Sequence, residues 1–261
     1  MNAIDLEAEY NNRARVPEHP AIIASWASDA AAYRHAHPPR VIRYGDGERH
    51  TLDLFEAGAG PCVMFIHGGY WQALDKSFFS HMARGLNAHG VSVAVPSYDL
   101  CPDVTIGDII RQMRRACLAL NDALHVPVTA CGHSAGGHLA ACLLATEDCV
   151  PHAYSISGLF DLAPLIETSL NEKLQLNPEL AKAYSPLFWP APAGKSLDVV
   201  VGGEESGEFH RQSAAMAERW GAGHTDVRVE SIPGANHFTV IGPLADSASP
   251  MVARLRDLAC A

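Results

Sequence analysis

The sequence predicts an α/β protein with a mostly parallel central sheet and helices on both of its faces. The first observation is that short apolar runs alternate with longer helical patterns from about residue 60 to the end of the chain. The second is that residues 62–67 form a short run that is apolar up to its last residue, His67, which is typical of a strand buried on both sides. The third is size, because 261 residues with 48% hydrophobic and 18% charged residues suit one large globular domain. We therefore expect a single domain over residues 1–261.

The expected elements follow in chain order. Residues 1–38 form an N-terminal arm whose helical segments are broken at Pro17 and Pro20. The alternating segments 41–44 and 51–55 are expected to pair as a hairpin. The later strands are expected at 62–67, 91–95, 128–131, 153–156, 197–201 and 227–232, and the helices at 77–89, 105–124, 136–147, 207–220 and 248–259. Residues 161–190 have no strand pattern, so we expect a small helical cap insertion there, over the site.

Composition excludes several classes of function. The net charge is −10 and the chain has no run of Lys or Arg, so nucleic acid is not expected as a partner. The seven cysteines have irregular spacings, which favours free buried thiols in a reducing compartment. The polar start Met1-Asn2-Ala3-Ile4-Asp5 lacks the features of a secretory signal, and no apolar run is long enough for a membrane. We expect a cytoplasmic protein that acts on a small molecule.

The segment 128–139 carries the strongest chemical signal. An apolar strand pattern runs into Gly132-His133-Ser134-Ala135-Gly136 and then into an Ala/Leu-rich helix. This arrangement is typical of a nucleophile elbow, a tight turn that lifts a serine above the sheet at a helix N-terminus. The flanking glycines leave room where the strand and the helix crowd together. The alternative is an ordinary serine in a glycine-rich turn.

Acyl transfer by a serine also needs a general base and an acid that orients it. His237 follows the last predicted strand in a loop of small, turn-forming residues, which suits the base. The acid is expected just after the strand at 197–201, where Glu204 and Glu205 are adjacent. We favour Glu205, because the loop after the two preceding glycines needs a few residues to turn back above the sheet. Asp161 and Asp226 do not follow that strand and are weaker candidates.

An oxyanion hole is indicated two strands before the elbow, in His67-Gly68-Gly69-Tyr70-Trp71. Gly68 and Gly69 let backbone N–H groups approach a substrate oxygen. Gly69, Tyr70 and Ala135 are the expected donors, and Tyr70 and Trp71 are expected to form an aromatic pocket wall. No cofactor is expected, and no metal either, since no His or Cys cluster has zinc-ligand spacing.

With these motifs in place, the chain resembles α/β-hydrolases of the kynurenine formamidase (arylformamidase) branch, near the hormone-sensitive-lipase-like esterases. The resemblance covers residues from about 60 to the end and includes the Tyr-Trp after His-Gly-Gly, where general esterases tend to have a third glycine. It rests on residues 67–72, 132–136, 157–162 and 205–213 and on the His237 loop, and residues 10–13 match the family's arm. From these motifs we also expect His133, Ser157 and Phe160 in the substrate pocket. The family's acid is usually aspartate where this chain has Glu205.

The resemblance implies hydrolysis of an aryl formamide, such as N-formylkynurenine, through a Ser134-His237-Glu205 triad and an acyl-enzyme. A carboxylesterase for small acyl esters is the first alternative, because it uses the same machinery with a different pocket. A non-catalytic ligand-binding α/β-hydrolase is the second, and loss of a triad residue would favour it. The sequence leaves the oligomeric state open, with a homo-oligomer as one option.

Overall fold

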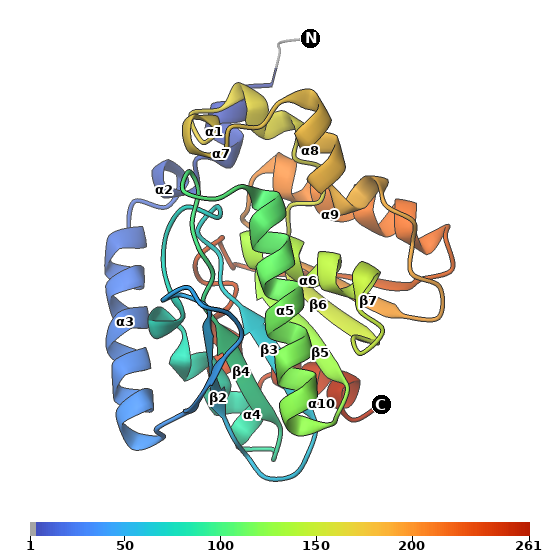
Figure 1. Cartoon of the computed structure of the whole chain (residues 1–261). Coiled ribbons are helices and arrows are strands. Elements are labelled where there is room, and N and C mark those ends of the chain that lie inside the picture. The colour runs from blue at the N-terminus through green and yellow to red at the C-terminus, as the bar shows by residue number, and fades with distance from the viewer. Residues whose placement is uncertain (1–3) are drawn as a thin grey trace.

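An eight-stranded sheet forms the centre of the structure, a computed structural model that describes residues 4–261 (Figure 1). The strand order is β1-β2-β4-β3-β5-β6-β7-β8, and only the β1–β2 and β2–β4 pairings are antiparallel. The strands are β1 (Arg40–Arg43), β2 (Thr51–Phe55), β3 (Cys62–Ile66), β4 (Ser92–Pro96), β5 (Val128–His133), β6 (His152–Ile156), β7 (Ser196–Gly202) and β8 (Asp226–Ile232). This is the mostly parallel sheet of the predicted α/β-hydrolase fold, and the prediction is confirmed.

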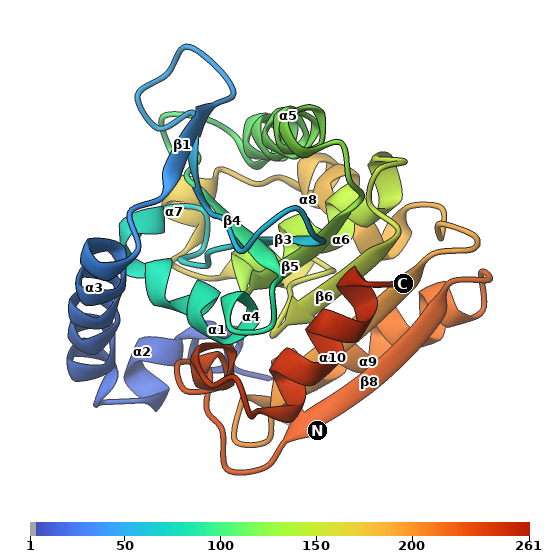
Figure 2. The ribbon, with the colours of Figure 1, turned by 90° about the horizontal axis from the view of Figure 1, so that it is seen from below.

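Helices cover both faces of this sheet, as Figures 1 and 2 show. The α-helices are α1 (Leu6–Tyr10), α2 (Asn12–Arg15), α3 (His19–Ala36), α4 (Arg84–Asn87), α5 (Ile106–Leu124), α6 (Ala135–Thr146), α7 (Asn171–Leu174), α8 (Pro178–Tyr184), α9 (Gly207–Gly221) and α10 (Pro250–Ala259). The 3₁₀ helices are η1 (Lys76–Phe78), η2 (Ser80–Ala83), η3 (Ala163–Glu167), η4 (Pro186–Phe188) and η5 (Gly242–Ala245). In Figure 2, α10 and α4 lie on the side of the sheet opposite α5.

Alternate residues of β3 explain why this strand is apolar throughout. Met64 and Ile66 belong to a core that also contains side chains of α5, α6 and α9. Val63 and Phe65 belong to a second core, on the other face, with side chains of α3, α4 and α10. Because successive side chains of a strand point to opposite faces, both faces of β3 must be hydrophobic.

The chain departs from the expected helix at 77–89. The structure has two short 3₁₀ helices there, η1 and η2, and then the single turn of α4. Packing explains the difference, because a Cβ on Gly85 would lie 2.4 Å from the carbonyl oxygen of Leu244. The backbone of α4 thus approaches the η5 segment closely. In the arm, Pro20 lies in the first turn of α3 and does not break the helix, because proline is tolerated at that position.

Helix α1 of the arm and the segment 161–190 lie against each other beyond the C-terminal ends of the strands, whereas α3 runs alongside the sheet (Figure 1). The segment is helical, as η3, α7, α8 and η4, and the Ser169 N–H and hydroxyl both donate to the Glu7 carboxylate of α1. Residues 1–3 of the expected arm lie outside the described residues. Across residues 4–261, no helix combines the length and apolar character needed to cross a bilayer.

Candidate active site

Ser134 occupies a strained turn between β5 and α6. Its backbone has φ 56° and ψ −118°, which is unusual for a residue other than glycine. The turn is also crowded, since a Cβ on Gly132 would lie 2.1 Å from the Gly136 carbonyl oxygen, and one on Gly136 would lie 2.0 Å from the Ile66 oxygen. Only glycine fits at these two positions, so the local sequence is what allows strand, turn and helix to meet around the serine.

Glu205 and His237 come together at the ends of β7 and β8. His237 Nδ1–H donates to Glu205 Oε2 at 2.6 Å, and both side chains are buried. The Ser157 hydroxyl and the Gly202 N–H both donate to the other oxygen, Oε1. Burial alone would raise the pKa of Glu205, but the charge and hydrogen bond of His237 and these two further donors outweigh it and lower the pKa. Glu205 is therefore held as a carboxylate.

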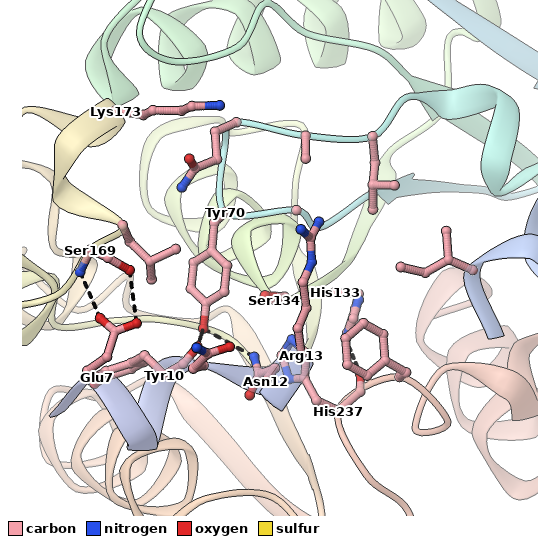
Figure 3. A pocket seen from close by; sticks show the side chains of 18 of the residues that line it. Glu7, Tyr10, Asn12, Arg13, Tyr70, His133, Ser134, Ser169, Lys173 and His237 are labelled. Carbon is pink, nitrogen blue, oxygen red and sulfur yellow. Dashed lines mark hydrogen bonds between the residues drawn. The ribbon is translucent and has the colours of Figure 1, made fainter. Parts of the chain in front are cut away.

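A second histidine holds the loop that carries His237. His133 Nε2–H donates to the backbone oxygen of His237 at 2.9 Å and so fixes the loop. Burial lowers the pKa of His133 to about 3, so this ring is neutral and acts as a donor. Because Glu205 accepts from Nδ1, the neutral His237 ring has its lone pair on Nε2. Ser134 and His237 line the same cavity (Figure 3), and within residues 4–261 the Ser134 hydroxyl forms no hydrogen bond.

The expected oxyanion loop lies directly against the serine. A Cβ on Gly68 would lie 3.0 Å from Ser134 Cβ. Gly69 has φ 109°, and Tyr70 also has a positive φ of 50°. Across the described chain, none of the amides of Gly69, Tyr70 and Ala135 donates to a carbonyl or side chain. These N–H groups are therefore free to bind a substrate oxygen.

The cavity has a volume of about 310 Å³ and lies between the arm, the oxyanion loop and the cap. This is the size expected for a small organic ligand. Its aromatic lining comes from Tyr10, Trp26, Tyr70 and Phe238, and Tyr70 and His133 are the two expected pocket residues that line it. Figure 3 shows the Tyr70 ring standing beside Ser134 in this space.

Three residues expected in the pocket lie elsewhere. Trp71 has φ 57° and is fully buried in the core, edge-on to His138, because the turn at Tyr70 and Trp71 reverses the side-chain direction. Phe160 is also fully buried in that core. Ser157 lies behind the site, where it supports Glu205. The expectation of an aromatic wall from both Tyr70 and Trp71 is thus corrected to Tyr70 alone.

Within residues 4–261, none of the remaining acidic candidates forms a hydrogen bond or an ion pair with His237. Glu204 is solvent-exposed. Asp161 accepts from the backbone N–H of Ala163. Asp226 begins β8, at the end of the strand opposite the His237 loop. Within residues 4–261, no group of three or more His, Cys, Asp or Glu side chains has a metal-binding arrangement.

Two arm residues that the sequence analysis did not assign to the site hold Tyr70 in place. The Tyr70 hydroxyl donates to the backbone oxygen of Tyr10 at 2.7 Å and accepts from Asn12 Nδ2 at 3.1 Å. Tyr10 is itself anchored, since its hydroxyl donates to Glu208 at 2.7 Å. The motif at 10–13 was the available signal, but a short polar motif does not reveal a contact with a loop sixty residues away.

The variant Ser157→Ala tests how the carboxylate of Glu205 is held in place. We expect kcat to fall roughly tenfold, because one hydrogen bond to a buried anion is lost. Since that bond lowers the pKa of Glu205, its loss raises this pKa. The acid limb of the pH–kcat profile should then move to higher pH, with KM little changed.

Ser155→Ala is the matched control for this variant. Ser155 is also buried, and its hydroxyl has no hydrogen-bond partner among the described residues. It should leave the pH profile in place. An unchanged profile in Ser157→Ala would show that Ser157 contributes only to packing.

Comparison with known proteins finds relatives over most of the chain. The chain is 32% identical to a kynurenine formamidase of Salmo salar over 227 residues, which is 78% of this chain and 76% of the relative. It is 30% identical to one of Danio rerio over 78% of this chain and 76% of the relative. No protein-family model matches the chain.

Solved structures give the same fold. A structure from Silicibacter sp. TM1040, described as a candidate thioesterase, has a TM-score of 0.86 and 37% identity, covering 96% of this chain and 98% of that one. A Pyrobaculum calidifontis esterase has a TM-score of 0.74 at 16% identity, covering 93% and 94%.

Proposed function

The chain belongs to the kynurenine formamidase family of α/β-hydrolases, and from this premise we propose that it hydrolyses an aryl formamide to formate and an arylamine. The observation that carries the proposal is the joint position of Ser134 and His237 in one cavity, with His237 bonded to Glu205. The aromatic lining supports a flat aryl substrate, because offset and edge contacts with a ring add about 1 kcal/mol beyond area burial.

In the first half of the reaction, Ser134 Oγ attacks the formyl carbon while His237 Nε2 takes the hydroxyl proton. The amides of Gly69, Tyr70 and Ala135 bind the resulting oxyanion, and each such donor is worth about 3 kcal/mol in the transition state. Glu205 stabilises the imidazolium. The C–N bond then breaks, and His237 gives its proton to the departing arylamine nitrogen.

The second half returns the enzyme to its starting state. A water molecule attacks the formyl ester on Ser134, and His237 Nε2 takes the water proton. When the tetrahedral species collapses, the ester C–O bond breaks and Ser134 regains a proton from His237. Formate leaves with the oxygen of the water, so the proposal needs no metal or cofactor.

An ester or thioester substrate is the second candidate, because the same residues cleave C–O and C–S bonds. The observation that favours it is the candidate thioesterase that is 37% identical over 96% of the chain. The relatives named kynurenine formamidases favour the formamide. The two candidates differ in the leaving group, which is an arylamine for the formamide and an alcohol or a thiol for the ester or thioester. Measured kcat/KM values for the two kinds of substrate decide between them.

The test compares kcat/KM for N-formylkynurenine with kcat/KM for p-nitrophenyl acetate, p-nitrophenyl octanoate and a small acyl thioester. We expect the formamide to be the preferred substrate and the octanoate ester to be poor, because a cavity of about 310 Å³ has little room for a long chain beside an aryl group. Faster turnover of the octanoate ester or of the thioester than of N-formylkynurenine would overturn the formamidase proposal.

A further inference from the structure

Two cysteine side chains meet at the end of the sheet opposite the active site, where α5 packs beside α6 (Figure 1). Cys117 belongs to α5, and Cys149 lies in the turn between α6 and β6. Their sulfur atoms are 3.9 Å apart, which is within hydrogen-bonding distance for two thiols. The Val128 N–H at the start of β5 donates to the Cys149 carbonyl oxygen, whereas Ser134 follows the end of this strand. The length of β5, roughly 16 Å at about 3.3 Å per residue, therefore separates the pair from the nucleophile.

The two thiols differ in their access to solvent. Cys117 is fully buried in the core between α5 and the sheet, whereas Cys149 is half-buried. Within residues 4–261, no other cysteine has its sulfur within hydrogen-bonding distance of a second sulfur. A small reactant that arrives from solvent therefore meets Cys149 first and reaches Cys117 only through it.

The surroundings of Cys149 favour its thiolate, which is the reactive form of cysteine. The hydrogen bond from Cys117 lowers the pKa of Cys149, and this effect outweighs partial burial and the Glu147 carboxylate, which raise it. The Lys195 ammonium also lowers this pKa, and it is held nearby because it donates to the backbone oxygens of Leu144 and Glu147. The same hydrogen bond, together with burial, raises the pKa of Cys117. Cys117 therefore stays a thiol and acts as the donor.

We propose that Cys149 and Cys117 form an oxidative modification site that reacts with hydroperoxides, hydrogen peroxide included, and ends as an internal disulfide. Cys149 is the thiol that the peroxide oxidises, and Cys117 is the neighbouring thiol that resolves the product. A sulfenic acid condenses with a thiol beside it, and the contact between the two sulfur atoms supplies that thiol. The site lies outside the catalytic cavity, so it does not depend on the proposed hydrolase activity.

The reaction has two steps. In the first, the Cys149 thiolate attacks one oxygen of hydrogen peroxide, so that an S–O bond forms, the O–O bond breaks and the departing hydroxide takes a proton from solvent. Cys149 is oxidised by two electrons to a sulfenic acid, and the peroxide is reduced to water. In the second, the Cys117 sulfur attacks the Cys149 sulfur while its proton passes to the departing hydroxide, which leaves as water. Side-chain rotation at the less buried Cys149 brings the sulfur atoms closer by about 2 Å, to the length of an S–S bond.

The experiment treats the whole protein with hydrogen peroxide, without denaturant, and measures its mass and its remaining free thiols. We expect the wild type to lose two thiols together, and peptide mapping to place the new disulfide between Cys117 and Cys149. Cys117→Ala should stop at the sulfenic acid on Cys149, which dimedone traps. Cys149→Ala should leave Cys117 reduced, because the thiol that peroxide reaches is gone. A wild type that stays reduced, or Cys117 that is oxidised equally fast in Cys149→Ala, would overturn the proposal.

Two other cysteines provide matched controls. Cys142 is buried in α6, and Cys260 is exposed after α10. Cys142→Ala and Cys260→Ala should both form the disulfide at the wild-type rate. Within the wild type, we expect Cys149 to react with hydrogen peroxide roughly tenfold faster than Cys260, because its surroundings favour the thiolate. If exposure alone set the rate, Cys260 would be the faster of the two, and that order of rates would contradict the proposal.

Thermal unfolding shows whether the disulfide forms within the native fold. The two cysteines are 32 positions apart, so a bond between them restricts the unfolded chain. We expect peroxide to raise the Tm of the wild type by roughly 5–10 °C, and dithiothreitol to reverse the rise. Cys117→Ala cannot close the loop and should show no such rise. A wild-type Tm that falls on oxidation would mean that the bond forms only by distorting the fold, and it would reject the proposal.

Discussion

Ser134→Ala is expected to lower kcat by roughly 10⁴-fold or more, because the residues of a triad act as a unit and the others cannot replace the nucleophile. Only the oxyanion donors and substrate binding would remain. The fold should survive, since the Ser134 hydroxyl has no hydrogen bond within residues 4–261. The measurement is kcat on N-formylkynurenine and on p-nitrophenyl acetate, with circular dichroism and thermal unfolding to check folding.

Covalent labelling distinguishes a lost nucleophile from a damaged site. A fluorophosphonate should label the wild type at Ser134 and should not label Ser134→Ala. Ser213→Ala is the control, because Ser213 is also buried but its hydroxyl donates to a carbonyl within α9. This control should be labelled and active. More than a tenth of wild-type turnover in Ser134→Ala would refute the nucleophile assignment.

The sequence predicts best where local steric demands are strict. At the elbow, Gly132 and Gly136 are required by carbonyl oxygens about 2 Å from any added Cβ, so the motif already contains the geometry. The continuous apolar run of β3 likewise predicts a strand with a core on each face. The choice of Glu205 over Glu204 rested on the length of the turn needed after β7, and the structure places Glu205 against His237.

Features that depend on distant segments were not predictable in the same way. Trp71 and Tyr70 are adjacent aromatics, but consecutive positive φ values send Trp71 into the core and leave Tyr70 in the cavity. The helical pattern at 77–89 is overridden by the close approach of Gly85 to the η5 segment. The contacts of the arm with Tyr70 and of Ser157 with Glu205 join residues 48 to 60 positions apart, and no local pattern contains them.

Glu205→Gln is expected to reduce kcat by roughly 10³–10⁴-fold, a loss second only to that of the nucleophile. The amide keeps the size of the side chain but removes the charge that stabilises the His237 imidazolium. It also lets the amide NH₂ donate to Nδ1, which favours the tautomer with the proton on Nε2. His237 then has no lone pair toward Ser134 and cannot take its proton. KM should change little, because Glu205 does not line the cavity.

Glu204→Gln is the matched control, since it makes the same change one residue away on an exposed side chain and should keep most of the activity.

Unfolding of the wild type at acid pH offers a second check on Glu205. Because its pKa is lowered in the folded protein, the stability that its charge contributes is present above the unfolded-state pKa. That stability is lost as the pH falls through the lower, folded-state pKa. Glu205→Gln should therefore unfold with a weaker pH dependence in this acid range than Glu204→Gln. If Glu204→Gln proves the more damaging change to kcat, the assignment of the orienting acid is wrong.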